Sequence, residues 1–437
     1  MLLCQGHRFM KIFNIIKNNS LVKTGANYSL TATIASVIGM AVSLLNMRWL
    51  GPSELGIWQS LCVVSAYVPF LQLGVQSGLN LELPVLLGKD DVSKAKEYIA
   101  NAYYINIIVT FLILFIGLVA TVVVWLKGFG LKYVLGVLAL TAVNVGSSIA
   151  YHFIARYRSS MSFDRLTRII RIQLGVSIFC VIFIYLYGFW GLLLYNAVPA
   201  LVYAGLMYKK SPFPEVSPHL EKNNLLYLIK RGVIQMLYVQ SSTAIKTFQQ
   251  MYLIRFGGVL YVGLFSPALA IGSIINLLPT QIAQFLVPQM GFKFGNTGQA
   301  RDLWPYVKKI FLYTPIAILP FSVLIALFLP WLINTFFPKY IESINAMQIM
   351  AFGFMFSCSS MTTNFLYTIK AYKEATIIIF SEFLCYLLLP SLFFKVIGLP
   401  ILISVAYGVS LAYLFVYLTT LFVMRYTLFK HKYNLNI

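Results

Sequence analysis

Twelve apolar runs, most of them long enough to cross a lipid bilayer, divide the chain and limit what it can fold into. A bilayer core about 30 Å thick is spanned by roughly 20 apolar residues of helix. The runs fall at 27–47, 59–86, 101–126, 131–154, 172–188, 191–208, 232–254, 260–288, 309–334, 344–368, 374–394 and 398–424. With 59% hydrophobic and 10% charged residues, the composition matches no soluble class. The sequence predicts an all-α membrane protein with twelve transmembrane helices.

The apolar stretch 172–208 has to hold two of these helices. As a single helix it would be about 55 Å long, which far exceeds the bilayer core. The segment Gly188-Phe-Trp-Gly191 lies in its middle and supplies a glycine-based turn. We therefore expect the fifth span to end, and the sixth to begin, at this turn.

The basic residues set the expected orientation. The chain has 33 Lys and Arg against 12 Asp and Glu, a net charge of +21, and nearly all of the charges lie between the apolar runs. If the N-terminus is cytoplasmic, the inner segments carry 26 basic residues and the outer segments carry 6. This asymmetry is typical of the positive-inside rule. It predicts that both termini are cytoplasmic, and it explains the basic charge without nucleic-acid binding.

Six spans lie on each side of a proline-containing connector, 209–231, which predicts two lobes. The N-lobe would be 1–208, including a cytoplasmic segment 1–26, and the C-lobe 232–437. A short repeat supports this division. At one constant offset, Arg48, Gly51, Gly56 and Trp58 match Arg255, Gly258, Gly263 and Phe265. Because each lobe has an even number of spans, the lobes should be related by a parallel pseudo-twofold around a central cavity. The four glycines are expected to be outer turn residues.

The seventh span carries a polar face. Gln235, Ser242, Lys246 and Gln249 follow one another at steps of seven, four and three, which place them on one side of a helix, with Gln250 beside them. Lys246 lies about 14 Å of helix from Arg255. A cation at that depth costs roughly 2.5–3.5 kcal/mol, so it should face water, a partner or an anionic substrate. The sequence favours an aqueous cavity; the alternative is that Lys246 pairs with one buried acid and joins two helices.

Two further groups of residues are candidates for the same site. Gln72 and Gln76 lie on a polar face of the second span, which could serve helix packing or the cavity. Glu382 is the one acid clearly at membrane depth, and it could bind a coupling proton or sodium ion, or neutralise a basic residue. Glu82 is expected near the interface. A cavity with a lysine and few acids suits an anionic ligand such as a diphosphate.

The sequence contains no sign of catalysis. It has no nucleotide-binding motif of the GxxxxGK[ST] type and no paired nucleophile and base. Its five cysteines lack the spacing of a metal site, and four lie in apolar runs as small core residues. His152, near the end of the fourth span, is expected to mark the membrane interface. We therefore predict neither an enzyme, nor a metal site, nor a cofactor other than a coupling ion.

Three segments resemble the bacterial polysaccharide transporters. They are RWLGPSELGIW…LQLGVQSGLNLELPVLL between Arg48 and Leu87, the loop Gly88 to Lys96, and the residues from Tyr187 to Leu192 after the basic loop RYRSSMSFDRLTR. The likeness is to the Wzx-type O-antigen and exopolysaccharide flippases of the multidrug/oligosaccharidyl-lipid/polysaccharide exporter superfamily. It implies two six-helix lobes around a cationic cavity, to which Lys246 would contribute. It also implies location in the bacterial inner membrane.

The resemblance further implies a substrate and partners. The substrate would be an undecaprenyl-diphosphate-linked oligosaccharide moved to the outer leaflet, and a glycan polymerase or chain-length protein could be a partner besides the membrane lipids. A cation-coupled multidrug exporter of the same superfamily is the main alternative, but it predicts a mid-membrane acid in the N-lobe, which this chain lacks. A glycan polymerase or ligase would need a long outer loop, and a channel would need no conformational cycle.

Overall fold

The structure, a computed structural model, describes residues 20–276, 290, 297, 299–358, 363, 366, 369 and 371–430. All regular elements in these ranges are helices. The predictions for most of the segment 1–26, for the later parts of the eighth and tenth apolar runs, and for the two termini lie outside the described residues.

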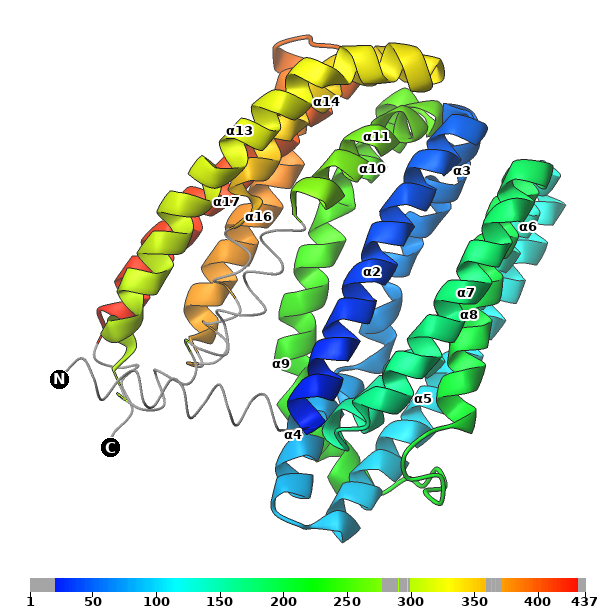
Figure 1. Ribbon diagram of the computed structural model, residues 1–437, viewed down its shortest axis with the longest axis vertical. Coiled ribbons are helices and arrows are strands. Elements are labelled where there is room, and N and C mark those ends of the chain that lie inside the picture. Colours follow the sequence, from blue (N-terminus) through cyan, green and yellow to red (C-terminus); the bar gives the residue numbers. More distant parts are fainter. Residues whose placement is uncertain are drawn as a thin grey trace. The chain divides into compact units, whose positions relative to one another are not determined.

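One compact unit is formed by Val68–Met236 together with the chain up to Val42. Its α5, α6, α7 and α8 pack against one another in a group (Figure 1). In chain order, the elements of this unit are the first part of α2 (Ser20–Trp49), η2 (Val68–Gln72), α4 (Val75–Gly88), α5 (Val92–Leu126), α6 (Leu131–Ser159), α7 (Phe163–Tyr187), α8 (Phe189–Lys209) and the first part of α9 (Lys222–Lys246).

The second compact unit combines Ser43–Tyr67 with Leu237–Ile437. Its described elements are the ends of α2 and α9, α3 (Pro52–Cys62), η1 (Val63–Ala66), α10 (Phe248–Gly257), α11 (Val259–Ile275), η3 (Ala300–Leu303), α13 (Trp304–Phe336), η4 (Pro338–Ser343), α14 (Ile344–Gly353), η5 (Phe354–Cys358), α16 (Tyr372–Ser391), η6 (Leu392–Val396) and α17 (Ile401–Leu428). The two units do not coincide with the predicted lobes. The chain changes unit within α2, between η1 and η2, and within α9.

The helices follow the predicted apolar runs. Nine helical segments in the described part of the chain are long and apolar enough to cross a membrane. The other three runs are represented by elements that do not meet this description in the described residues: the seventh by α9 and α10, the eighth by α11, and the tenth by α14 and η5. The predicted turn inside 172–208 is confirmed, because α7 ends at Tyr187 and α8 begins at Phe189. Gly188 alone makes this turn, with a φ of 56° that favours glycine.

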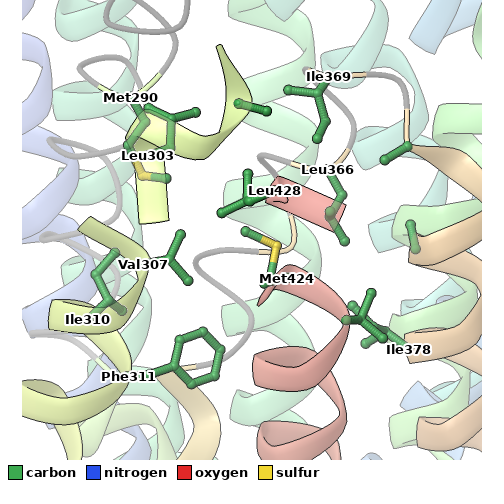
Figure 2. Close-up of a cluster of buried hydrophobic side chains, with 14 residues drawn as sticks. Met290, Leu303, Val307, Ile310, Phe311, Leu366, Ile369, Ile378, Met424 and Leu428 are labelled. Carbon is green, nitrogen blue, oxygen red and sulfur yellow. The ribbon is translucent and has the colours of Figure 1, made fainter. Parts of the chain in front are cut away.

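The core of the second unit lies where α13, α16 and α17 meet, as Figure 2 shows. Val307, Ile310 and Phe311 of α13 lie opposite Met424 and Leu428 of α17. Ile378 of α16 belongs to the same cluster. Because lipid tails are as apolar as these side chains, the contact is stabilised by close packing rather than by removal from water.

The connector between Lys209 and Lys222 is fixed to the first unit. Lys96 forms a 2.8 Å ion pair with Glu215, and this contact holds the pKa of the Glu215 carboxyl below its usual value. The backbone N–H of Glu221 donates to the side-chain oxygen of Asn101 over 2.7 Å. The connector is therefore a docked strap, and the residues after it, 222–231, already belong to α9.

Candidate functional site

The second and seventh spans are both interrupted within the membrane region. In the second, α3 gives way to the 3₁₀ turns η1 and η2, and Leu73 and Gly74 then adopt left-handed conformations (φ 50° and 82°) before α4 begins. In the seventh, α9 ends at Lys246 and α10 begins at Phe248. The sequence analysis treated both spans as continuous helices, which is wrong. Interrupted helices are typical of transporter binding sites, because they expose backbone groups to a cavity.

A hydrogen bond joins the two interruptions. The hydroxyl oxygens of Tyr67 and Thr247 lie 3.0 Å apart. Thr247 also donates to the carbonyl oxygen of Ala244 over 2.7 Å, which closes the last turn of α9. The break in the second span is therefore held beside the residue that follows Lys246.

Lys246 pairs with Glu382 of α16. Its ammonium nitrogen lies 3.8 Å from a carboxylate oxygen of Glu382. The glutamate side chain is only 9% exposed, whereas that of the lysine is 40% exposed. Ser242, one turn before Lys246, donates a hydrogen bond to the same carboxylate. Lys246 thus has the buried acidic partner of the alternative interpretation, and its side chain is also partly exposed, while the aqueous cavity stays a prediction.

Aromatic side chains surround this pair. Phe248 follows the break in the seventh span, and Phe383 follows Glu382. Their rings meet edge to face with centroids 5.7 Å apart. Tyr386, one turn after Glu382, is 2% exposed and packs edge to face on Tyr413. Since such surroundings lower the local dielectric, a charge on Lys246 acts more strongly here than it would in water.

The remaining predicted site residues divide between the units. Gln249 and Gln250 lie on α10 in the second unit with Lys246, whereas Gln72, Gln76 and Gln235 belong to the first unit. Gln249 is buried and Gln250 half-buried, while Gln235 is exposed and Gln72 buried. The turn at Thr247 separates Gln249 from the face that Ser242 and Lys246 share.

Several buried polar atoms of the second unit have no hydrogen-bond partner among the described residues. Six of them are the side-chain oxygens of Asn46, Gln59, Ser60, Ser65, Gln249 and Tyr252. All six are carried by the ends of the first and seventh spans and by the outer part of the second. Buried polar atoms are nearly always paired, so these are the groups that remain available to a hydroxyl-bearing ligand.

Gln76 has a different environment from the one expected. Its side chain is 1% exposed. Its amide nitrogen donates to the carbonyl oxygen of Ala102 over 3.0 Å, and its amide oxygen lies 3.0 Å from Nδ1 of His152. Both ends of the amide are therefore engaged between α4, α5 and α6, and we leave Gln76 out of the proposed site.

His152 leads to a buried cation that the sequence analysis missed. The histidine is fully buried, and its position relative to the membrane interface stays a prediction. Arg156 donates to its Nε2 from Nε and Nη2, over 3.1 and 2.7 Å. The guanidinium also lies over the ring of Tyr103, 5.0 Å from its centroid, and donates to the carbonyl oxygen of Phe213 in the strap. Because it receives two N–H donors on Nε2, His152 has to be neutral with its proton on Nδ1.

Glu82 joins α4 to the first part of α9. Its carboxylate accepts from Nε of Arg231 over 2.6 Å and from the Tyr227 hydroxyl over 3.2 Å. The Glu82 side chain is 10% exposed, and its position near the membrane interface stays a prediction. The pairing ties the start of the seventh span to the inner half of the second.

Gly56 and Gly263 are contact residues inside helices and not the outer turn residues predicted. A side chain on Gly56 would overlap the carbonyl oxygen of Val259, and one on Gly263 would overlap that of Pro52. Pro52 and Val259 occupy equivalent positions of the internal repeat, as the two glycines do. The crossing of α3 and α11 is therefore reciprocal, as a local twofold axis requires. Gly51 and Gly258 do precede their helices as predicted.

Metal ligands do not gather in the described residues: no group of three His, Cys, Asp or Glu side chains lies close enough to hold an ion there. Among the same residues, Cys62, Cys180 and Cys385 are free thiols within the membrane region.

The chain is similar to known membrane proteins over most of its length. Residues 46–346 match the family described as polysaccharide biosynthesis protein. An uncharacterised membrane protein of Methanocaldococcus jannaschii is 24% identical over 370 residues, which are 77% of this chain and 70% of that protein.

Solved structures of transporters share the fold. An inward-facing multidrug resistance MATE family transporter of the MOP superfamily superposes with a TM-score of 0.73 at 16% identity, covering 89% of this chain and 94% of the other. An outward-facing form gives 0.66 at 15% identity over 94% and 97%. A Pyrococcus furiosus transporter of the superfamily, described as having a binding pocket of reversed polarity, gives 0.61 at 15% identity over 95% and 97%.

These findings confirm the predicted fold class, twelve membrane helices in two lobes. The matching structures are those of transporters, so the fold agrees with the prediction that the protein is not an enzyme. The chain belongs to the polysaccharide biosynthesis protein family and is a multi-pass membrane protein with the fold of MOP-superfamily transporters.

Proposed function

We propose that the protein is a flippase. Its substrate would be an undecaprenyl-diphosphate-linked oligosaccharide, carried from the cytoplasmic to the outer leaflet of the bacterial inner membrane by alternating access. Both termini would be cytoplasmic, in keeping with the distribution of basic residues. The lipid tail would remain in the bilayer while the sugar crosses through water.

The observation that carries this proposal is the partly exposed side chain of Lys246 at the break of the seventh span. A lysine with an open side in a membrane interior requires an anion or water to compensate it. The diphosphate of a lipid carrier supplies such an anion. The unpaired oxygens of Gln249, Gln59 and Ser65 could accept hydrogen bonds from sugar hydroxyls.

A cation-coupled drug exporter fits these residues less well. Glu382, the acid that would hold the coupling ion or attract a cationic drug, already has Lys246 as its partner. Glu82, the deep acid of the predicted N-lobe, pairs with Arg231. Neither carboxylate is left without a cation.

The test is a flipping assay with the reconstituted full-length protein. The probe is a fluorescent polyprenyl-diphosphate-linked disaccharide, and the readout is the fraction that becomes accessible to a periodate solution on the opposite side of the vesicle. We expect transport by the wild type, loss of at least about tenfold in rate for Lys246→Ala, and normal transport for Lys89→Ala, which removes an exposed lysine.

The opposite results are equally clear. A Lys246→Ala protein that is monodisperse and flips the probe at the wild-type rate would refute the role of Lys246. A wild-type protein that leaves this probe untouched but moves ethidium against a proton gradient would replace the flippase by the exporter.

A further inference from the structure

Two ion pairs on α16 share a geometry that the other ion pairs of the described residues lack. Lys246 lies 3.8 Å from Glu382, and Lys430 lies 3.9 Å from Glu374. In both pairs the glutamate side chain is 9% exposed and the lysine is 40% or 37% exposed. By contrast, Glu82 and Arg231 approach to 2.6 Å.

The lengths of these contacts show how tightly each lysine is held. A charge-assisted hydrogen bond between an ammonium and a carboxylate is normally about 2.7–2.9 Å long. At 3.8–3.9 Å the two lysines are attracted by their glutamates but not locked to them. A lysine ammonium has three donors, so the open side of each can accept another anion.

The two glutamates lie on one buried side of α16. Glu374, Ile378 and Glu382 follow at steps of four and are all buried. Eight residues of helix separate the carboxylates by about 12 Å along the axis. Glu374 is in the first turn of α16, next to the end of α17, and Glu382 lies deeper in the span.

The surroundings of Lys430 suit a cation that is not saturated by its acid. Its ammonium lies 4.0 Å from the centroid of the Tyr426 ring. One carboxylate oxygen of Glu374 is buried and has no hydrogen-bond partner among the described residues. The pair formed by Lys430 and Glu374 is therefore incompletely satisfied on both sides.

We propose that Lys430 and Lys246 are two successive stations for the diphosphate of the substrate, and that Glu374 and Glu382 occupy these lysines when no substrate is present. This proposal rests on the proposed function and adds to it a second station, near the end of the chain. The incoming diphosphate displaces each carboxylate from its lysine by competition, without any covalent step.

The exchange of glutamate for diphosphate explains how a lysine can be stable in the membrane without substrate and yet bind its substrate reversibly. The glutamate neutralises the lysine before the substrate arrives and after it leaves. A diphosphate carries more negative charge than one carboxylate and therefore competes well. Neutral and cationic lipids cannot displace the glutamate, which makes the pair selective for anionic head groups.

The first experiment measures affinity. Farnesyl diphosphate and inorganic pyrophosphate are titrated into the purified full-length protein in nanodiscs of neutral lipid, at fixed ionic strength. Removing a competitor should tighten binding, so we expect Glu382→Gln and Glu374→Gln each to lower Kd by about threefold to tenfold. Glu342→Gln, which removes an exposed acid, is the matched control and should leave Kd unchanged.

The second experiment locates the probe. Acylation of lysines by sulfo-N-hydroxysuccinimide acetate is followed by mass spectrometry, with the exposed Lys89 as the internal reference. Farnesyl diphosphate should slow the acylation of both Lys246 and Lys430 relative to Lys89. In the absence of a probe, each Glu→Gln variant should speed the acylation of its own lysine and leave that of the other lysine unchanged.

The results of the two experiments test the second station, the exchange and the proposed function separately. Protection of Lys246 alone would overturn the second station and leave the proposed function intact. Equal Kd values for the wild type and both Glu→Gln variants would overturn the exchange. Failure of every form to bind either probe would refute both the stations and the proposed function. If a Glu→Gln variant does not yield monodisperse protein, Glu→Asp at the same position shortens the side chain and should give an intermediate decrease in Kd.

Discussion

Two basic residues in the membrane region of this chain have quite different partners. Lys246 has a distant acid and an open side. Arg156 is 2% exposed and is held by a neutral histidine, an aromatic ring and a backbone carbonyl. A guanidinium, with its planar set of donors, can be satisfied in this way, whereas a lysine ammonium is easily shared. The difference assigns packing to Arg156 and ligand exchange to Lys246.

Of Lys246 and Arg156, only Lys246 could be recognised from the sequence. Lys246 stands out because it interrupts an apolar run, which is a local signal. Arg156 follows the end of its run and was counted among the loop residues. Its burial depends on Tyr103 and Phe213, which are distant in sequence and supply the contacts only after the helices have packed. No periodicity in the chain reports such contacts.

The network around His152 makes Gln76 a stability residue. Gln76→Leu would leave Nδ1 of His152 and the carbonyl oxygen of Ala102 unpaired, at a cost of about 1–3 kcal/mol for each buried group. We expect a lower melting temperature, with flipping retained at permissive temperature. The measurement is the thermal loss of the monodisperse peak in size-exclusion chromatography, with the exposed Gln235→Leu as the control. A Gln76→Leu protein with a normal melting temperature and no transport would instead support a role of Gln76 in the substrate cavity.

At the scale of elements, the breaks in the second and seventh spans determine where polar groups gather. The apolar runs gave the spans but not these breaks, because the residues from Val63 to Gly74 and around Thr247 differ little in hydropathy from their neighbours. What bends the chain is the left-handed backbone at Leu73 and Gly74 and the hydroxyl of Thr247 bonded one turn back. Both are details of conformation that apolar content does not encode.

The glycine crossing between α3 and α11 gives a test of reciprocity. Gly56→Val and Gly263→Val each force the helices apart at the same crossing, because either side chain would overlap a backbone oxygen of the other helix. Each should destabilise the protein by about 1–3 kcal/mol. The double variant should lose clearly less stability than the sum of the two losses, because the first substitution has already opened the contact.

Thermal unfolding of the four proteins completes this double-mutant cycle. Gly205→Val is the control, since a side chain there would meet no atom within 4 Å. Additive losses would mean that the two glycines act at separate contacts.

At the scale of the whole molecule, counting apolar runs predicted the twelve helices, and the resemblance of short segments such as Arg48 to Leu87 predicted the family. The division into compact units was not predictable in this way. Ser43–Tyr67 packs with the C-terminal part of the chain, and Lys222–Met236 packs with the N-terminal part. Which helix face meets which partner is decided by side-chain packing, and apolar runs carry little information about it. The predicted lobe boundaries at 208 and 232 remain a prediction.

This exchange of segments predicts that the two halves hold together after the strap is cut. A protease site inserted between Ser217 and Pro218, which are exposed, can be cleaved in the purified protein. The fragments should still elute as one species in mild detergent, because Ser43–Tyr67 stays packed on the C-terminal fragment. Cleavage of the same protein carrying Gly56→Val should release a part of it. Complete separation without that substitution would show that the strap alone joins the halves.

The reciprocal crossing of α3 and α11 also bears on the origin of the chain. A polypeptide with half this length, assembled as a homodimer about a twofold axis, would make the same crossing with one glycine used twice. After gene duplication and fusion, each copy becomes a separate target of selection. Pro52 and Val259 already differ at equivalent positions, whereas Gly56 and Gly263 do not, because a side chain at either would meet the backbone of the other copy. The crossing thus has the reciprocal contacts that such a dimer interface would have.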